Sequence, residues 1–236
     1  MLCRTGDVLS MGCRLSAGIA TTYLLTVIAG SAYSSSVYTA EESWQHTYLE
    51  NTGAVESSHT WIVRKRGERV ETHWITPDKA YFNLCDATGA TLEWRFRGNA
   101  ADIRAWRSGD RIRLEGTRDG KTVNEDIEID ASPWFQPLSY ALGRFSQSQR
   151  DSIAFWTIRP DNLDVVKLRA SNLGDEQVTT KAGTFTARKI SISLNGFLSH
   201  FWQAHYWFRH TDGLFVRYRG ANGLPGTPTT TIQLGG

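Results

Sequence analysis

Hydrophobic and polar residues alternate one by one along much of this chain. In Thr91–Arg97, the residues Leu92, Trp94 and Phe96 fall on one face of an extended segment, and charged residues fall on the other. Arg111–Glu115 repeats this period of two. Strict alternation is typical of β-strands with one face toward a core and one toward water. The pattern therefore predicts an antiparallel sheet with one buried face.

Turn-forming residues separate these extended segments. The dipeptides between strand-like runs are Asp119-Gly120, Asn195-Gly196 and Asp212-Gly213, and further turns are expected at Gly67, Gly89, Gly109 and Gly183. Asn-Gly and Asp-Gly supply the positive φ values that two-residue hairpin turns need. A spacing of about 8–12 residues between turns is typical of an all-β sheet, sandwich or barrel. In the second half, strands are expected at 153–159, 165–170, 184–194, 201–208, 214–219 and 229–234.

One segment has the period of a helix instead. Its residues Trp134, Leu138, Ala141, Leu142 and Phe145 fall on one helical face. A helix is expected to begin at Pro133, with Ser132 as its N-cap, or at Pro137, and to end near Gln149. We therefore expect an all-β or β-rich α+β fold. A single curved antiparallel sheet would form an open or partly closed barrel, with one amphipathic helix packed against it.

The first 32 residues read as a secretory signal peptide. Arg14 precedes an uncharged run that ends in the small residues Gly30-Ser31-Ala32, and Met11 is an alternative start to Met1. An uncleaved membrane anchor is the alternative, because the run has about the minimum length of a spanning helix. We favour cleavage, which leaves no transmembrane span. Residues 33–236 are then expected to form a single β-rich domain in the periplasm.

Composition narrows the class of protein. The chain has 236 residues, 40% of them hydrophobic, and a formal net charge of +2. This excludes global disorder, which goes with low hydrophobicity and high net charge. The near-neutral charge also argues against a nucleic-acid partner. After removal of residues 1–32 only Cys85 remains, in an apolar run, and we expect it to be a buried, unreactive thiol.

Candidate catalytic groups are few. His200, His205 and His210 are spaced five residues apart, which separates them on a strand and on a helix, so we expect no metal site. Glu125 shares a face with Val123 and Ile127, and a buried glutamate there would have a raised pKa. The chain has no Gly-x-Ser-x-Gly elbow and no glycine-rich phosphate loop, and no cofactor is implied.

Aromatic residues are the most distinctive feature, with nine tryptophans in the chain. Core packing is one explanation for them, because each large ring buries much apolar area. The other is a lining for an amphipathic or lipid-like ligand, with nearby arginines for an anionic head. On this second explanation the ligand-binding residues are Leu92, Trp94, Phe96, Trp134, Trp156, Arg159, Trp207 and Arg209.

Several segments in the second half carry a family resemblance. They are 133–136, 155–160, 183–190, 206–209, 212–218 and 223–228. Together they resemble an uncharacterised family of exported bacterial β-rich domains, in which a Gly-x-Phe-x-Ala segment precedes a C-terminal Tyr-Trp-Phe hairpin. That family is similar in architecture to the periplasmic lipoprotein-localisation carriers, whose curved sheet holds acyl chains. The resemblance implies no catalytic residues.

These observations lead to one hypothesis and two alternatives. We expect an exported, non-enzymatic protein that binds an amphipathic or lipid-like ligand on the concave face of an open β-barrel. The first alternative is a scaffold or assembly protein of the cell envelope, with an envelope protein as its partner and a purely structural aromatic core. The second is a hydrolase of an envelope glycan or lipid.

Overall fold

The computed structural model describes residues 42–194, 202–221 and 228–236. The predicted signal peptide and the turn at Asn195-Gly196 lie outside these residues. The described segments contain a single helix and fourteen strands, all of which belong to one antiparallel sheet. The elements are β1 (Glu42–Thr52), β2 (Val55–Arg66), β3 (Arg69–Ile75), β4 (Lys79–Cys85), β5 (Thr91–Gly98), β6 (Ala101–Ser108), β7 (Arg111–Arg118), β8 (Lys121–Glu128), α1 (Leu138–Ser146), β9 (Ser152–Ile158), β10 (Val165–Thr180), β11 (Gly183–Leu194), β12 (Gln203–Arg209), β13 (Phe215–Ala221) and β14 (Thr229–Leu234).

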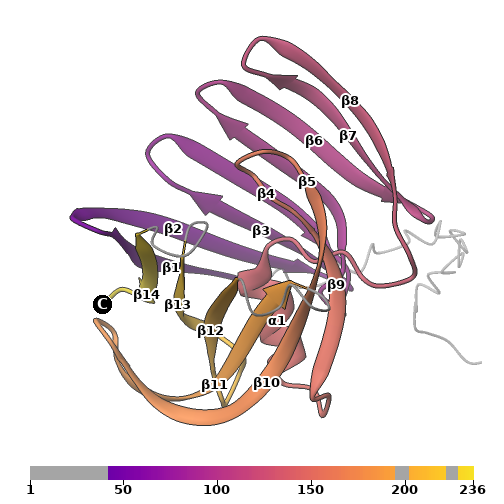
Figure 1. Ribbon diagram of the computed structural model, residues 1–236. Coiled ribbons are helices and arrows are strands. Elements are labelled where there is room, and N and C mark those ends of the chain that lie inside the picture. The colour runs from indigo at the N-terminus through magenta and orange to yellow at the C-terminus, as the bar shows by residue number, and fades with distance from the viewer. Residues whose placement is uncertain (1–41, 195–201, 222–227) are drawn as a thin grey trace, which may run out of the picture. The chain divides into compact units, whose positions relative to one another are not determined.

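The sheet consists of two meanders joined at its middle. The first arm, β1 to β8, runs outward by consecutive hairpins, and the second arm, β9 to β14, runs back inward. β1 pairs with β14 where the two arms meet, so the first and last strands in chain order are neighbours in the sheet. β8 and β9 are the two end strands and the sheet does not close, as Figure 1 shows. The expected open, curved antiparallel sheet with one helix is confirmed.

The turns have the chemistry that their sequences predict. Asp119 and Gly120, between β7 and β8, have φ values of 50° and 73°. Gly109 and Gly213, in two other hairpins, also have positive φ values, of 63° and 72°. Two-residue hairpins need such left-handed residues to match the twist of their strands.

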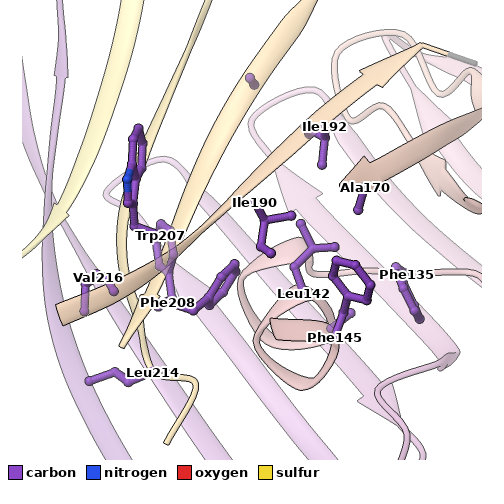
Figure 2. Close-up of a cluster of buried hydrophobic side chains, with 14 of the residues drawn as sticks. Phe135, Leu142, Phe145, Ala170, Ile190, Ile192, Trp207, Phe208, Leu214 and Val216 are labelled. Atoms are coloured by element: carbon purple, nitrogen blue, oxygen red, sulfur yellow. The ribbon is translucent and has the colours of Figure 1, made fainter. Parts of the chain in front are cut away.

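The helix is shorter than its apolar pattern suggests. α1 begins after Pro137, the second of the two expected starts, and its N-cap is Pro137 itself. Ala141, Leu142 and Phe145 are buried against the second arm. Figure 2 shows Leu142 and Phe145 beside Ile190 and Phe208. The helix also approaches the β12–β13 turn closely at Gly143. A Cβ atom there would lie 2.5 Å from the carbonyl oxygen of Gly213, so only glycine fits.

Two strands differ from their predicted pattern. β10 continues ten residues past Ala170, the predicted end, because it crosses a bulge between Asn172 and Asp175 into a polar stretch without apolar alternation. In β5, Cys85 pairs with Thr91 and Leu84 with Glu93, which leaves Leu92 as an extra residue. A bulge reverses the alternation, so Thr91 is 1% exposed and Leu92 is 36% exposed. The prediction that Leu92 shares a face with Trp94 is wrong.

Candidate functional site

A short extended segment ahead of α1 connects the two arms. Gln136 donates its backbone N–H to Thr91 Oγ1 of β5 at 2.7 Å, and Thr91 Oγ1 donates to the carbonyl oxygen of Gln136 at 2.8 Å. The side chain of Gln136 reaches β9, where its Oε1 accepts from Thr157 Oγ1 at 2.9 Å and from the Ile158 N–H at 3.1 Å. The segment 134–136 therefore connects β5 to β9 through hydrogen bonds, whereas the end strands β8 and β9 do not pair with each other.

A cavity of about 380 Å³ lies between this segment, α1 and both arms, and we call it the inner cavity. Its volume falls in the range of small-molecule sites, and most of its lining is apolar or aromatic. The residues that line it are Trp74, Tyr81, Asn83, Trp94, Gln136, Pro137, Leu138, Ser139, Thr157, Ile158, Arg159, Pro160, Leu168, Ile192, Trp202, Tyr206, Phe215, Tyr218 and Ile232.

The polar groups of the inner cavity are almost all neutral. Burial raises the pKa of Tyr81 and of Tyr218 to about 12, and it raises the pKa of Tyr206 further, so all three phenols keep their protons at neutral pH. Among the described residues that line the cavity, Arg159 is the one with a charged side chain; this side chain is 47% exposed and pairs with Asp161 at 2.6 Å. The cavity thus has an apolar, neutral interior and one cation at an exposed edge.

Four of the predicted site residues lie at this cavity or behind its wall. Trp94 and Arg159 line it. Phe96 stacks on Trp94 with ring centroids 5.9 Å apart, and it also stacks on Tyr81 at 5.0 Å. Trp134 is fully buried in the same hydrophobic cluster as Trp94, and it bridges to Trp156 rather than belonging to the helix.

Trp156 lies at the edge of that cluster, toward solvent. Its Nε1–H donates to Asp130 Oδ1 at 2.9 Å, and the Lys167 ammonium, which also pairs with Asp130, lies 5.6 Å from the centre of its ring. These contacts hold the pKa of the Asp130 carboxyl well below its usual range, and the Lys167 hydrogen bond has the largest effect. Trp156 is therefore positioned by an ion pair and does not line the inner cavity.

Trp207 lies at a different hollow, on the other face of the sheet. Its neighbour Tyr206 lines the inner cavity, and adjacent residues of a strand point to opposite faces. Trp207 Nε1 donates to Glu176 Oε1 at 2.6 Å, and the cations of Lys189 and Arg217 lie 5.3 and 6.0 Å from its ring. We call this hollow of about 490 Å³ the opposite-face hollow. The structure thus places Trp207 and Trp94, which were predicted to bind one ligand together, at different hollows.

Arg209 lies at a third hollow. This hollow, of about 690 Å³, also contains His46, Trp61 and Asp212. Arg209 donates to both carboxylate oxygens of Asp212, at 2.9 and 2.5 Å. This pairing lowers the pKa of Asp212. The sequence pattern thus grouped residues that the structure divides among three hollows.

The other candidate groups have structural partners. Cys85 is fully buried and burial raises the pKa of its thiol to about 12, so the prediction of a buried, unreactive thiol is confirmed. Glu125 shares a face with Val123 and Ile127, as predicted, but it lies on the end strand β8 and is exposed. His210 Nδ1 lies 2.9 Å from Asp175, and His200 is outside the described residues. Within residues 42–194, 202–221 and 228–236, no cluster of three potential metal ligands occurs.

Sequence reasoning missed the polar residues of the inner cavity. Asn83 is the single amide in the otherwise apolar segment Tyr81–Cys85 of β4, and this position could have identified it as a candidate from the sequence. Gln136 gave no such signal, because its contacts come from strands 45 and 21–22 residues away.

Known structures resemble this fold, although no protein-family model and no curated protein sequence matches the chain. A β-barrel-like protein of the domain of unknown function DUF1849 from Brucella abortus has a TM-score of 0.55 and 9% identity. The match covers 80% of this chain and 94% of that one. The resemblance to an uncharacterised β-rich family is thus confirmed at the level of the fold.

A second structure is more distant. It is a Bacteroides fragilis protein with a YmcC-like fold, described as inferred to be exported, with a TM-score of 0.31 and 14% identity over 82% of this chain and 93% of that one. In the described part of the chain, no helix is both long and apolar enough to cross a membrane.

Proposed function

We propose that this chain is an exported, periplasmic protein that binds an amphipathic, lipid-like molecule in the inner cavity. The apolar body would lie among Trp74, Ile192 and Phe215, and an anionic group would meet Arg159 at the exposed edge. Residues 1–32 would direct export, and residues 33–236 would form the mature domain. The observation that carries this proposal is an apolar, neutral cavity of about 380 Å³ with a single cation in its lining.

The binding test uses myristic acid and two variants of the full chain. Leu138 is half-buried at the start of α1 and lines the inner cavity, so Leu138→Trp adds bulk inside it. Leu173→Trp is the matched control, because Leu173 is 54% exposed on β10 and lines none of the three hollows described above. We expect the wild type and Leu173→Trp to bind alike, and Leu138→Trp to bind at least about tenfold more weakly.

The location of the site is wrong if Leu138→Trp binds as the wild type does. A wild type that binds no myristic acid contradicts lipid binding. The export part has its own measurement: the full chain is expressed in a bacterial host, recovered from the periplasm and weighed by native mass spectrometry. We expect an N-terminus at Tyr33 and, after organic extraction, a stoichiometric lipid. A processed protein without any ligand would instead favour the envelope scaffold.

A further inference from the structure

Two fully buried polar residues stand side by side in the wall of the inner cavity. Asn83 of β4 and Trp94 of β5 are paired in register, so their side chains lie on the same face. The Cβ atoms of directly opposed residues are about 5 Å apart in an antiparallel pair. Both residues are 0% exposed to solvent, and both line the cavity.

Each of these residues has an unused hydrogen-bonding atom. Asn83 Nδ2 donates to Thr72 Oγ1 at 3.1 Å, but its Oδ1 has no partner among the described residues. In the same part of the chain, the Nε1–H of Trp94 has no partner either. Gln136 and Thr157, which line the same cavity, form a hydrogen bond with each other, and neither of them bonds to Asn83 Oδ1 or to Trp94 Nε1. A buried polar atom without a partner is costly, and such atoms are often completed by a water or a ligand.

The two unused atoms have complementary roles. Asn83 Oδ1 is an acceptor and Trp94 Nε1–H is a donor. A hydroxyl group satisfies both at once, because its O–H donates to the amide oxygen while its oxygen accepts from the indole. A carboxylate offers no proton to Asn83, and an ammonium offers no lone pair to Trp94. The neutral lining of the cavity also supplies no countercharge at this depth.

We propose that Asn83 and Trp94 form a hydroxyl-binding subsite inside the inner cavity. The preferred ligand then has an apolar body that bears a neutral hydroxyl group, in addition to any anionic group at Arg159. This inference rests on the proposed function, since it requires a ligand in that cavity. It goes further by naming the chemical group that the buried wall selects.

Three probes of one length test the subsite on the full chain: undecyl alcohol, decyl methyl ether and dodecane. The alcohol both donates and accepts, the ether only accepts, and dodecane does neither. Affinities are measured by displacement of aminoanthracene. We expect the wild type to prefer the alcohol to the ether by about tenfold, the effect of one buried hydrogen bond. Asn83→Leu should abolish that preference. The control Thr72→Val removes only the hydroxyl that accepts from Asn83 Nδ2, and it should keep the preference.

A second variant does not depend on the folding of Asn83→Leu. Trp94→Phe keeps an aromatic ring and loses the N–H, so it should weaken the alcohol and the ether by a similar factor and leave dodecane unchanged. Equal binding of alcohol and ether to the wild type overturns the subsite while leaving the proposed function intact. Equal loss of all three probes in Trp94→Phe also overturns it, because packing would then explain the effect. Failure of every probe to bind a wild type that still binds myristic acid overturns the subsite alone, whereas failure of the probes and of myristic acid overturns the proposed function as well.

Discussion

Tyr206 and Trp207 are neighbours in β12, yet they line hollows of opposite character. Tyr206 lies in the inner cavity, where Arg159, at the edge, is the only charged residue in the described part of the lining. Trp207 lies in the opposite-face hollow with Lys189, Arg217, Arg219 and Glu176. Its indole is 6% exposed, and cations lie against the ring. The pleat of one strand thus separates an apolar site from a charged one.

Two tryptophans that are similarly buried differ in the partner of the indole N–H. A tryptophan whose N–H has a carboxylate partner is complete without a ligand, and Trp207 is in that state. Trp94 has an equally buried ring and an N–H without a partner. Burial alone therefore does not distinguish the two rings, whereas the hydrogen bonding of their N–H groups does.

The largest effects are expected from truncation of either ring. Trp94→Ala and Trp207→Ala should each lower the free energy of unfolding by about 3–5 kcal/mol, measured by urea denaturation. Ligand retention by the folded fraction should fall in Trp94→Ala and stay unchanged in Trp207→Ala. Equal loss of retention in the two variants would contradict the assignment of the rings to separate hollows.

A smaller effect is expected where Gln136 joins the arms beside the inner cavity. Gln136→Ala removes the partner of Thr157 Oγ1 and leaves buried groups unsatisfied, so it should destabilise the protein by about 1–3 kcal/mol. The matched control is Gln147→Ala. Gln147 is exposed and donates only to the carbonyl oxygen of His210, so its replacement should cost less than about 0.5 kcal/mol. Similar costs for both variants would mean that Gln136 does not connect the arms.

The hydrogen bond in the opposite-face hollow should contribute less again. A double-mutant cycle with Trp207→Phe and Glu176→Ala cancels the change in ring size and isolates the contact between Nε1 and the carboxylate. We expect a coupling energy of about 1 kcal/mol from thermal or urea unfolding. The same cycle with Trp94→Phe in place of Trp207→Phe should give a coupling near zero. A substantial coupling there would argue against independent hollows.

The smallest effect concerns pH. Burial, followed by the nearby Lys189, lowers the pKa of His205 below its ordinary value; Glu176 raises this pKa by less than Lys189 lowers it, and Arg219 lowers it by the smallest amount. The unfolded chain therefore binds a proton at His205 more readily than the folded protein does. Stability should fall as the pH drops below about 6.5, the ordinary histidine value.

The variant His205→Gln should show a smaller loss of urea midpoint between about pH 8 and pH 5 than the wild type shows. Part of the loss should remain, because burial also lowers the pKa of His46, His59 and His73. An identical loss in variant and wild type would mean that the opposite-face hollow does not disfavour a charged His205.

Most of the fold follows from short-range patterns in the sequence. The alternation in Arg111–Glu115 marks half-buried strand because side chains alternate with the pleat wherever the strand is placed. Asp119-Gly120 forms a hairpin because both residues tolerate positive φ, and Leu142 and Phe145 share a helical face because the helix has a fixed period. These rules act within a few residues, so they could be read directly from the chain.

The pairing of strands distant in the sequence determines which residues meet at the candidate site. The register of β4 against β5 makes Leu92 a bulge residue and brings Asn83 beside Trp94, and neither result follows from β5 alone. The pairing of β1 with β14 places the arms, and Gln136 then spans them through Thr91 and Thr157. Alternation shows which residues share a face, but only the curvature of the whole sheet decides which face becomes a cavity. That is why Trp94 and Trp207 look alike in the sequence and differ in the folded protein.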